Sequence, residues 1–272
     1  MAMMKSMGRA QQLGVRKLAG ALGAEITGLD LTRTVDDKTL ADVRAAFLEN
    51  QVICIRGQHA MTPEDQLAFA ARWGEVAVHP YVPSIEGFPG IMRISDPTAI
   101  TETWHADTTH AACPPALTLL LARVLPEVGG DTMFSSGYRV YESLSPGLQQ
   151  ALATLRAVHH GTELASSAGL DESAVTTTHP VVRTHPETGR RALFVNGNYV
   201  SHFEGWNEGE SAPLLQYLYD QVARPEHTYR HRWQDGDLII WDNRCTQHAV
   251  VADTGGAERV LHRVTIAGDT PV

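Results

Sequence analysis

The sequence predicts a mainly β protein in which flanking helices surround a closed or sandwiched antiparallel core of the jelly-roll type. Three observations favour this fold class. Short apolar segments with the composition of strands recur along the 272 residues, helical segments are scattered among them without regular alternation, and no repeat or Pro/Gly-rich linker divides the chain. We therefore expect one domain over residues 13–272, preceded by a disordered leader over residues 1–12.

Capping residues mark two helix starts. Asp36 and Asp37 precede apolar residues at helical spacing, and Thr62-Pro63-Glu64-Asp65 resembles a capped start with Pro63 at the first helical position. Further helices are expected after Ser145-Pro146 and around residues 214–222. The apolar positions that give these four patterns are Leu40, Val43, Phe47, Leu148, Leu152, Leu155, Leu214, Leu215, Leu218 and Val222.

Segments rich in β-branched and other apolar residues mark the strands of the core. The expected strands cover residues 52–55, 117–124, 191–195, 228–233, 238–241 and 260–266. Residues 161–178 break this order, because they are rich in Ser, Ala, Thr and Gly and show little apolar periodicity. A structureless loop of that length is usually functional or disordered, so we expect a lid-like insertion there.

The charge of the chain limits its partners. A net charge of −9 without any Lys/Arg-rich run argues against nucleic acid and anionic membrane surfaces. The sequence also lacks a bilayer-spanning apolar stretch, and residues 1–12 lack the apolar run of a signal peptide. Cys54, Cys113 and Cys245 are too widely spaced for a disulfide framework or a zinc cluster. We therefore expect a cytoplasmic protein.

A His-x-Asp motif gives the first chemical signal. In Trp104-His105-Ala106-Asp107, an extended backbone would direct the His105 and Asp107 side chains to the same face. An imidazole beside a carboxylate suits divalent iron, which accepts both ligand types and needs open positions for its substrates. Because the chain has 13 histidines, such a pair also arises by chance. The alternative interpretation is a surface histidine hydrogen-bonded to a nearby aspartate.

His248 is the candidate for a third ligand. It follows the strand expected at 238–241 and the turn-like Asp242-Asn243-Arg244. Two histidines and one carboxylate complete a facial triad for iron, but zinc hydrolases use the same ligand types. A structural histidine is the remaining alternative, so the choice of metal depends on other residues.

The segment 258–266, which contains the strand expected at 260–266, carries two arginines on the same face. A period of two places Arg259, Leu261, Arg263 and Thr265 on one face, and most of the apolar residues on the other. The pattern alone favours arginines on a solvated surface. In a barrel with a ligand-filled interior, however, the polar face points inward, and two buried arginines require anionic partners.

These residues resemble the taurine dioxygenase (TauD/TfdA-like) family of Fe(II)/2-oxoglutarate-dependent dioxygenases. The similarity extends over almost the whole chain, from residues 22–28 to residues 265–269. The most specific stretches are WHAD at 104–107, GGDT at 129–132, HPVVRTHP at 179–186 and WDNRCTQH at 241–248. The resemblance implies a cupin-like double-stranded β-helix.

The resemblance also implies a catalytic centre and a co-substrate site. Fe(II) would be held by His105, Asp107 and His248, and the distal carboxylate of 2-oxoglutarate by Arg259 and Thr132. O2 would be the other co-substrate, with succinate and CO2 released as a substrate carbon is hydroxylated. The arginines fit this role, because an Arg fork binds a carboxylate, sulfonate or sulfate in two places.

The implied substrate is a small organic anion held by Arg263, in a pocket that His79 helps to line. Val82, Thr101 and Tyr199 stand where the taurine enzyme has a tyrosine, an asparagine and a phenylalanine. Two polar contacts to a small zwitterion are therefore altered. This favours an alkyl sulfate, another alkyl sulfonate or an aryloxyalkanoate over taurine, in an enzyme of sulfur metabolism or a related process.

Two other classes of protein fit some of these features. A zinc-dependent hydrolase on the same fold keeps the three ligands but has no use for Arg259 beside Thr132. A non-catalytic anion-binding barrel keeps the arginines without needing iron. Besides the substrate, the expected partner is a second copy of the chain, in a dimer or tetramer.

Overall fold

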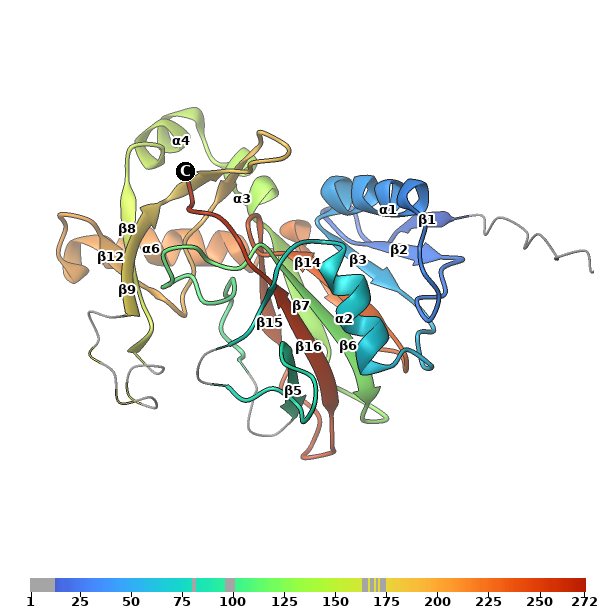
Figure 1. Cartoon of the computed structure of the whole chain (residues 1–272). Helices are drawn as coiled ribbons and strands as arrows, with labels where there is room; N and C mark the ends of the chain where they lie inside the picture. The colour runs from blue at the N-terminus through green and yellow to red at the C-terminus, as the bar shows by residue number, and fades with distance from the viewer. Residues whose placement is uncertain are drawn as a thin grey trace, which may run out of the picture.

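The computed structural model describes residues 13–79, 82–95, 101–162 and 175–272, together with residues 166, 169 and 171 (Figure 1). The leader expected at 1–12 lies outside these residues. The described part is mainly β, with several sheets and flanking helices. None of its helices has the length and apolar character needed to cross a membrane.

One large sheet forms the centre of the molecule. Its strand order is β1-β2-β3-β14-β6-β16-β4, with β5 also paired to β16, and only β2 and β3 run parallel. The bounds are β1 Gly14–Lys17, β2 Ala24–Thr27, β3 Val52–Ile55, β4 Val76–Ala77, β5 Ile91–Ser95, β6 Leu117–Val124, β14 Leu238–Asp242 and β16 Val260–Ile266.

A smaller antiparallel sheet, in the order β13-β7-β15, faces the large one. Its strands are β7 Thr132–Ser136, β13 Thr228–His231 and β15 Thr246–Val250. A buried cluster joins the two sheets, with Phe134 of β7 packed near Trp241 of β14 and Leu261 of β16. Of the metal-site candidates, His248 lies on β15 of the smaller sheet, and an isolated bridge pairs it with His105.

Helices α1 (Asp37–Asn50) and α2 (Pro63–Ala71) cover the outer face of the large sheet (Figure 1). Their apolar residues pack with Ile53, Leu119 and Ile240 in one cluster. Strands β3, β6 and β14 are thus buried on both faces, which explains their continuous apolar sequences.

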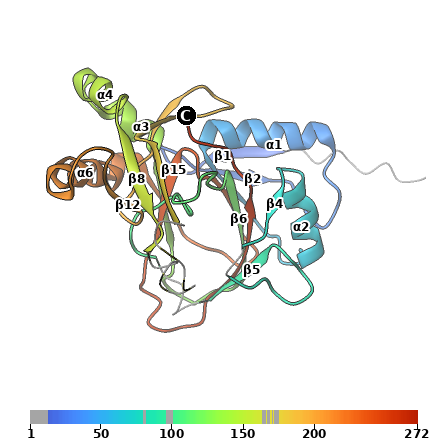
Figure 2. The same ribbon diagram turned by 60° about the vertical axis from the view of Figure 1, so that its left-hand side comes forward.

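The remaining elements form a layer on the side of the two-sheet core that faces away from α1 and α2 (Figure 2). A three-stranded sheet in the order β12-β8-β9 and the hairpin β10-β11 pack with three further helices, α3, α4 and α6, through a separate apolar cluster. The bounds are β8 Arg156–His160, β9 Thr176–Pro180, β10 Val182–Thr184, β11 Arg191–Leu193, β12 Val200–Phe203, α3 Gly137–Ser143, α4 Pro146–Leu152, α6 Glu208–Val222 and the short 3-10 helix η2 Pro225–His227.

Most expected elements are confirmed, and some bounds need correction. Asp36 caps α1, and Thr62 caps α2 in a reciprocal pair with Asp65. The helix after Ser145-Pro146 ends at Leu152, before the expected Leu155, and the strands expected at 191–195 and 228–233 are each two residues shorter. In all three cases the element ends earlier than expected, because tertiary contacts determine where the chain turns.

The insertion expected at 161–178 is shorter than its composition indicated. Residues 176–178 belong to β9, which pairs with β8, and the Gly161 amide donates to the Val175 carbonyl at 2.8 Å. The two ends of the loop are therefore joined by the sheet. Most of residues 163–174 lie outside the described part of the chain.

Candidate active site

A backbone bridge brings the predicted metal ligands together. The amide of His105 donates to the carbonyl of His248 at 3.0 Å, and the amide of His248 donates to the carbonyl of His105 at 2.7 Å. His248 lies on β15, whereas His105 precedes a turn that contains Asp107. The extended backbone expected for residues 104–107 is therefore wrong at Asp107, and Thr108, next along, has a φ of +41°.

The three side chains converge on one point. The Oδ1 atom of Asp107 lies 4.0 Å from His105 Nε2 and 3.7 Å from His248 Nε2, and all three ligand atoms lie within 4.8 Å of one another. All three residues are buried. One small ion between them could contact two imidazole nitrogens and one carboxylate oxygen, so the residues fit the facial site expected from the sequence.

Hydrogen bonds hold two of these candidate ligands, Asp107 and His105. Thr118 donates to Asp107 Oδ2 at 2.7 Å, and Asn243 Oδ1 accepts from the Asp107 amide at 3.2 Å while its Nδ2 donates to Thr118 at 3.0 Å. His105 Nδ1 lies 2.8 Å from the Thr103 carbonyl, which can only accept. The proton of His105 is therefore on Nδ1, and Nε2 presents its lone pair.

Burial and neighbouring charges favour the protonation states in which these three side chains can bind a metal. Burial opposes ionisation of Asp107, but Arg263 and then His248 and His105 outweigh it and hold the pKa of that carboxyl well below its usual range. Burial is also the main cause that lowers the pKa of His248, to about 3, and that of His105. Two neutral imidazoles and a carboxylate are the forms that bind a metal.

The two arginines of the β16 segment both point into the molecule. Arg259 is only 2% exposed, and its Nη2 donates to Thr132 Oγ1 at 3.4 Å. Trp233 lies under the Arg259 guanidinium and donates to the same hydroxyl at 3.1 Å. Arg263 Nη2 lies 2.7 Å from Asp107 Oδ2. The surface interpretation of this strand face is therefore wrong, because both faces of β16 are covered.

A cavity of about 660 Å³ opens beside the three ligands. His79, Val82, Thr101, Tyr199 and Arg263, which the sequence placed in the substrate pocket, all line it. His105 and Asp107 form part of its wall, but Thr132 and Arg259 are not among its lining residues. The structure thus groups the predicted substrate residues around the triad and places the predicted co-substrate pair apart from this cavity.

The protein-family model "Taurine catabolism dioxygenase TauD, TfdA family" matches residues 14–265. The chain belongs to this family. It is accordingly a 2-oxoglutarate (α-ketoglutarate)-dependent dioxygenase, which confirms the resemblance inferred from the sequence motifs.

Curated relatives support the assignment over most of the chain. The alkylsulfatase of Acinetobacter baylyi is 37% identical over 274 residues, covering 95% of this chain and 86% of that protein. The α-ketoglutarate-dependent sulfate ester dioxygenase of Pseudomonas putida is 35% identical over 278 residues, covering 97% of this chain and 92% of that protein.

Solved structures give the same result for the fold. A taurine dioxygenase from Burkholderia xenovorans superposes with a TM-score of 0.87 at 37% identity, covering 96% of this chain and 91% of that one. AAD-2 in complex with Mn(II) and N-oxalylglycine superposes with a TM-score of 0.83 at 27% identity, covering 95% of this chain and 98% of that one. The structural match implies a jelly-roll fold for this dioxygenase.

Sequence reasoning missed several residues of the site. Thr118 and Asn243 hold Asp107, although Thr118 lies inside an apolar strand and Asn243 inside a quoted motif. The only polar residue in the run 117–121 is Thr118, and a hydroxyl at such a position is a usable signal. His110, three residues beyond Asp107, also lines the cavity, and no sequence pattern identified it.

Two other groups of potential ligands occur among the described residues, namely Cys54 with His231 and Asp237, and His185 with Asp242 and Cys245. Their imidazole and carboxylate atoms bond to one another or to buried arginines, as in the contacts of His231 with Asp237 at 3.1 Å and of His185 with Asp242 at 3.0 Å. Burial raises the pKa of both thiols, which disfavours the thiolate that binds metals. We therefore interpret both groups as structural.

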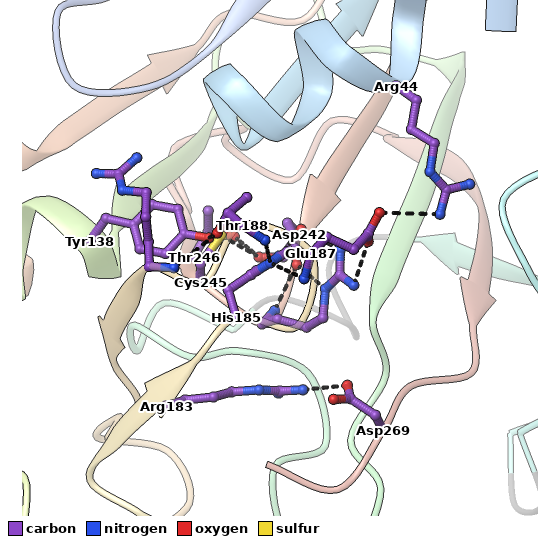
Figure 3. Close-up of polar contacts among 12 residues, drawn as sticks. Arg44, Tyr138, Arg183, His185, Glu187, Thr188, Asp242, Cys245, Thr246 and Asp269 are labelled. Atoms are coloured by element: carbon purple, nitrogen blue, oxygen red, sulfur yellow. Dashed lines mark hydrogen bonds and ion pairs between the residues drawn. The ribbon is translucent and has the colours of Figure 1, made fainter. Parts of the chain in front are cut away.

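The second of these groups supports the turn that leads to His248 (Figure 3). Arg244 grips Asp242 through Nε at 2.8 Å and Nη2 at 2.7 Å, and His185 contacts the same carboxylate. Arg244 Nη1 extends the network to Glu187 at 2.7 Å. Because Asp242 ends β14 immediately before Asn243, this buried cluster fixes the residue that holds the Asp107 backbone.

Asp242→Asn should lower the free energy of unfolding by about 3–5 kcal/mol, because it removes the buried charge that Arg244 contacts through two nitrogens and leaves Arg244 with Glu187 alone. Urea denaturation at pH 7 measures the change. The exposed Asp235 provides a control, since Asp235→Asn should alter stability by less than about 0.5 kcal/mol. A loss below about 1 kcal/mol for Asp242→Asn would mean that the network contributes little.

The same carboxyl predicts a pH dependence of stability. Burial raises the pKa of Asp242, but hydrogen bonds from Arg244 and His185 outweigh it and lower this pKa to about 2. A depressed pKa contributes stability that is present above the unfolded value of about 3.9 and lost as pH falls toward the folded value. The stability difference between wild type and Asp242→Asn should therefore shrink on acidification from pH 5 to pH 2. A difference that stays constant over this range would contradict the assignment.

Proposed function

We propose that the dioxygenase uses Fe(II) held by His105, Asp107 and His248 to hydroxylate a small organic anion. The observation that carries this proposal is the position of Arg263, whose guanidinium lines the cavity and lies 2.7 Å from Asp107. An anion bound there would be held next to the metal ligands. The donor set leaves open positions for co-substrates, as iron sites of this type require.

Membership of the family favours this function over the two alternatives raised by the sequence, the zinc-dependent hydrolase and the non-catalytic anion-binding barrel. We also propose that the jelly roll is a double-stranded β-helix, in one domain over residues 13–272. A homo-oligomer and a cytoplasmic location stay predictions.

The co-substrate site is proposed at Arg259 and Thr132. The planar guanidinium of Arg259 can donate two parallel hydrogen bonds to a carboxylate, and the distal carboxylate of 2-oxoglutarate would accept them. Trp233 would hold the Arg259 guanidinium in position, because the guanidinium carbon lies 5.6 Å from the centroid of the Trp233 ring. Both side chains also bond to Thr132. When bound, iron, 2-oxoglutarate and O2 would supply the oxidising chemistry, in which O2 is the oxidant: one of its oxygen atoms goes to succinate, the other to the substrate hydroxyl group, and CO2 is released. The residues of the chain orient the reactants and exclude water.

Arg263 is proposed to bind the anionic group of the substrate. A guanidinium fork matches two oxygens of a sulfate, sulfonate or carboxylate, and one fixed anion would determine which carbon faces the metal. Hydroxylation of a carbon that bears a sulfate ester would leave an unstable product. It would collapse to an aldehyde as the C–O bond to sulfate breaks and the hydroxyl proton is lost.

Several lines of support favour a substrate larger than taurine. A cavity of about 660 Å³ is in the range of drug-sized ligand sites. Val82 contributes an apolar side chain at the exposed rim, where its exposed fraction is 40%, and Thr101 and Tyr199 complete the wall. Relatives include the alkylsulfatase, the sulfate ester dioxygenase and a (S)-phenoxypropionate dioxygenase of Sphingobium herbicidovorans that is 33% identical. We propose alkyl sulfates, alkyl sulfonates or aryloxyalkanoates as the substrate class.

Succinate formation from 2-oxoglutarate tests the function directly. The enzyme, reconstituted anaerobically with Fe(II) and then given O2, should form succinate faster when an alkyl sulfate, alkyl sulfonate or aryloxyalkanoate is present. Zn(II) in place of Fe(II) should support no turnover. Stimulation by none of these anions, in a preparation that binds Fe(II), would refute the proposed substrate class.

His105→Ala, Asp107→Ala and His248→Ala should each abolish succinate formation and weaken Fe(II) binding, because each removes one of three protein ligands. Anaerobic calorimetry measures the binding separately from turnover. His202→Ala is the matched control, since His202 lies on β12 and bonds to Ser201 away from the triad. Iron-dependent turnover in any triad variant would remove that residue from the metal site.

Variants of Arg259 and Arg263 should show different kinetic defects. Each variant is assayed at saturating Fe(II), because Arg263 also contacts Asp107. Arg259→Gln should raise the KM for 2-oxoglutarate with every substrate. Arg263→Gln should leave substrate-free decarboxylation of 2-oxoglutarate largely intact. It should weaken binding of the primary substrate by about 2 kcal/mol or more, which lowers kcat/KM about thirtyfold. The same defect toward 2-oxoglutarate in both variants would contradict this division.

A further inference from the structure

A side chamber of about 350 Å³ adjoins the main cavity. The two share His79, His110 and Tyr199 among their lining residues, and the chamber extends to His160, Thr162 and Asn198. The Tyr199 ring lies 6.4 Å from the His105 ring and 5.2 Å from the His110 ring. A substrate that passes Tyr199 would thus have one part near the metal ligands and a distant part near His110.

His110 occupies the wall between the two spaces. It is 7% exposed, and its ring packs against Gly161, where an added Cβ would lie 3.0 Å from Cδ2, Cγ and Nδ1. Nδ1 is inaccessible to solvent and has no hydrogen-bond partner in the described part of the chain. The buried, unpartnered nitrogen of His110 is Nδ1 and not Nε2, and the ring lines both spaces, so Nε2 is the nitrogen that can meet a ligand.

The packing of His110 indicates which nitrogen carries the proton. An N–H group that is buried without an acceptor is rarer in proteins than an acceptor that lacks a donor. Nδ1 is therefore the bare nitrogen, and Nε2 carries the hydrogen. The ring presents a hydrogen-bond donor to whatever enters between the main cavity and the side chamber.

The described lining of the side chamber carries no permanent charge. Burial lowers the pKa of His110, with smaller effects from His79 and His160, and burial followed by Arg263 lowers the pKa of His79. No Lys, Arg, Asp or Glu is found among the described residues that line it. A second anionic group would meet no Lys or Arg among these described residues, whereas an ether or hydroxyl oxygen could accept the donated hydrogen bond.

We propose that the side chamber binds an uncharged oxygen on the distal part of the substrate, and that His110 determines this specificity. The inference rests on the proposed function, in which Arg263 holds the anionic end. It distinguishes a polar, ether- or hydroxyl-bearing organic anion from a simple alkyl anion of the same length.

Two length-matched probes test the proposal, n-octyl sulfate and its 3,6-dioxa analogue, in which two methylene groups are ether oxygens. Their dissociation constants are measured by calorimetry under anaerobic conditions, on enzyme loaded with Fe(II) and 2-oxoglutarate. His110→Phe keeps an aromatic ring but removes the donor, so it should shift the ratio of the two constants against the dioxa probe by about tenfold. His110→Gln, which keeps an N–H donor, should restore most of the preference.

His202→Phe makes the same chemical change outside both cavities and should leave the ratio unchanged. If His110→Phe changes the ratio by less than about twofold, or weakens both probes equally, the assignment of His110 is wrong while the proposed function stands. If wild type binds neither probe, and no anion stimulates succinate formation, both the proposed substrate class and this assignment fail.

Discussion

The reciprocal backbone bridge between His105 and His248 is the constraint on which the site depends. These residues are far apart in the sequence, and each donates its amide to the other's carbonyl. The bridge extends the small sheet through β15 to the segment that carries Asp107. These bonds fix the backbone of both histidines, so part of the ordering cost is met before a metal binds.

Asp107 divides its two oxygens between different tasks. Oδ1 lies toward the two histidines, whereas Oδ2 accepts from Thr118 and contacts Arg263. A buried carboxylate is costly unless it is paired and hydrogen-bonded, and both conditions are met on the side away from the metal. The same pairing places a guanidinium at the cavity wall, so support of the metal ligand and proposed recognition of the substrate anion use one side chain. Asn243 connects this arrangement to the buried Asp242–Arg244 cluster behind it.

Much of this could be predicted from the sequence because the signals were local. Capping residues marked α1 and α2, continuous apolar runs marked β3 and β6, and motif spacing identified the family. The turn at Asp107 was missed because a tertiary contact, the Asn243 bond to its amide, determines the backbone there. The facing of Arg259 and Arg263 was ambiguous because α2 covers one face of β16 and the small sheet covers the other, so period two could not separate core from surface. The position of His110 depends on its packing against Gly161, which no pattern of single residues encodes.

We propose that His105, Asp107 and His248 hold the catalytic metal, and not either of the other two groups of potential ligands. Anomalous diffraction at the iron absorption edge, from crystals grown anaerobically with Fe(II) and 2-oxoglutarate, locates the metal without reference to activity. We expect one strong iron peak between the three side chains, with the distal carboxylate of 2-oxoglutarate at Arg259. A peak at Cys54, His231 and Asp237, or at His185, Asp242 and Cys245, with none at the triad, would contradict it.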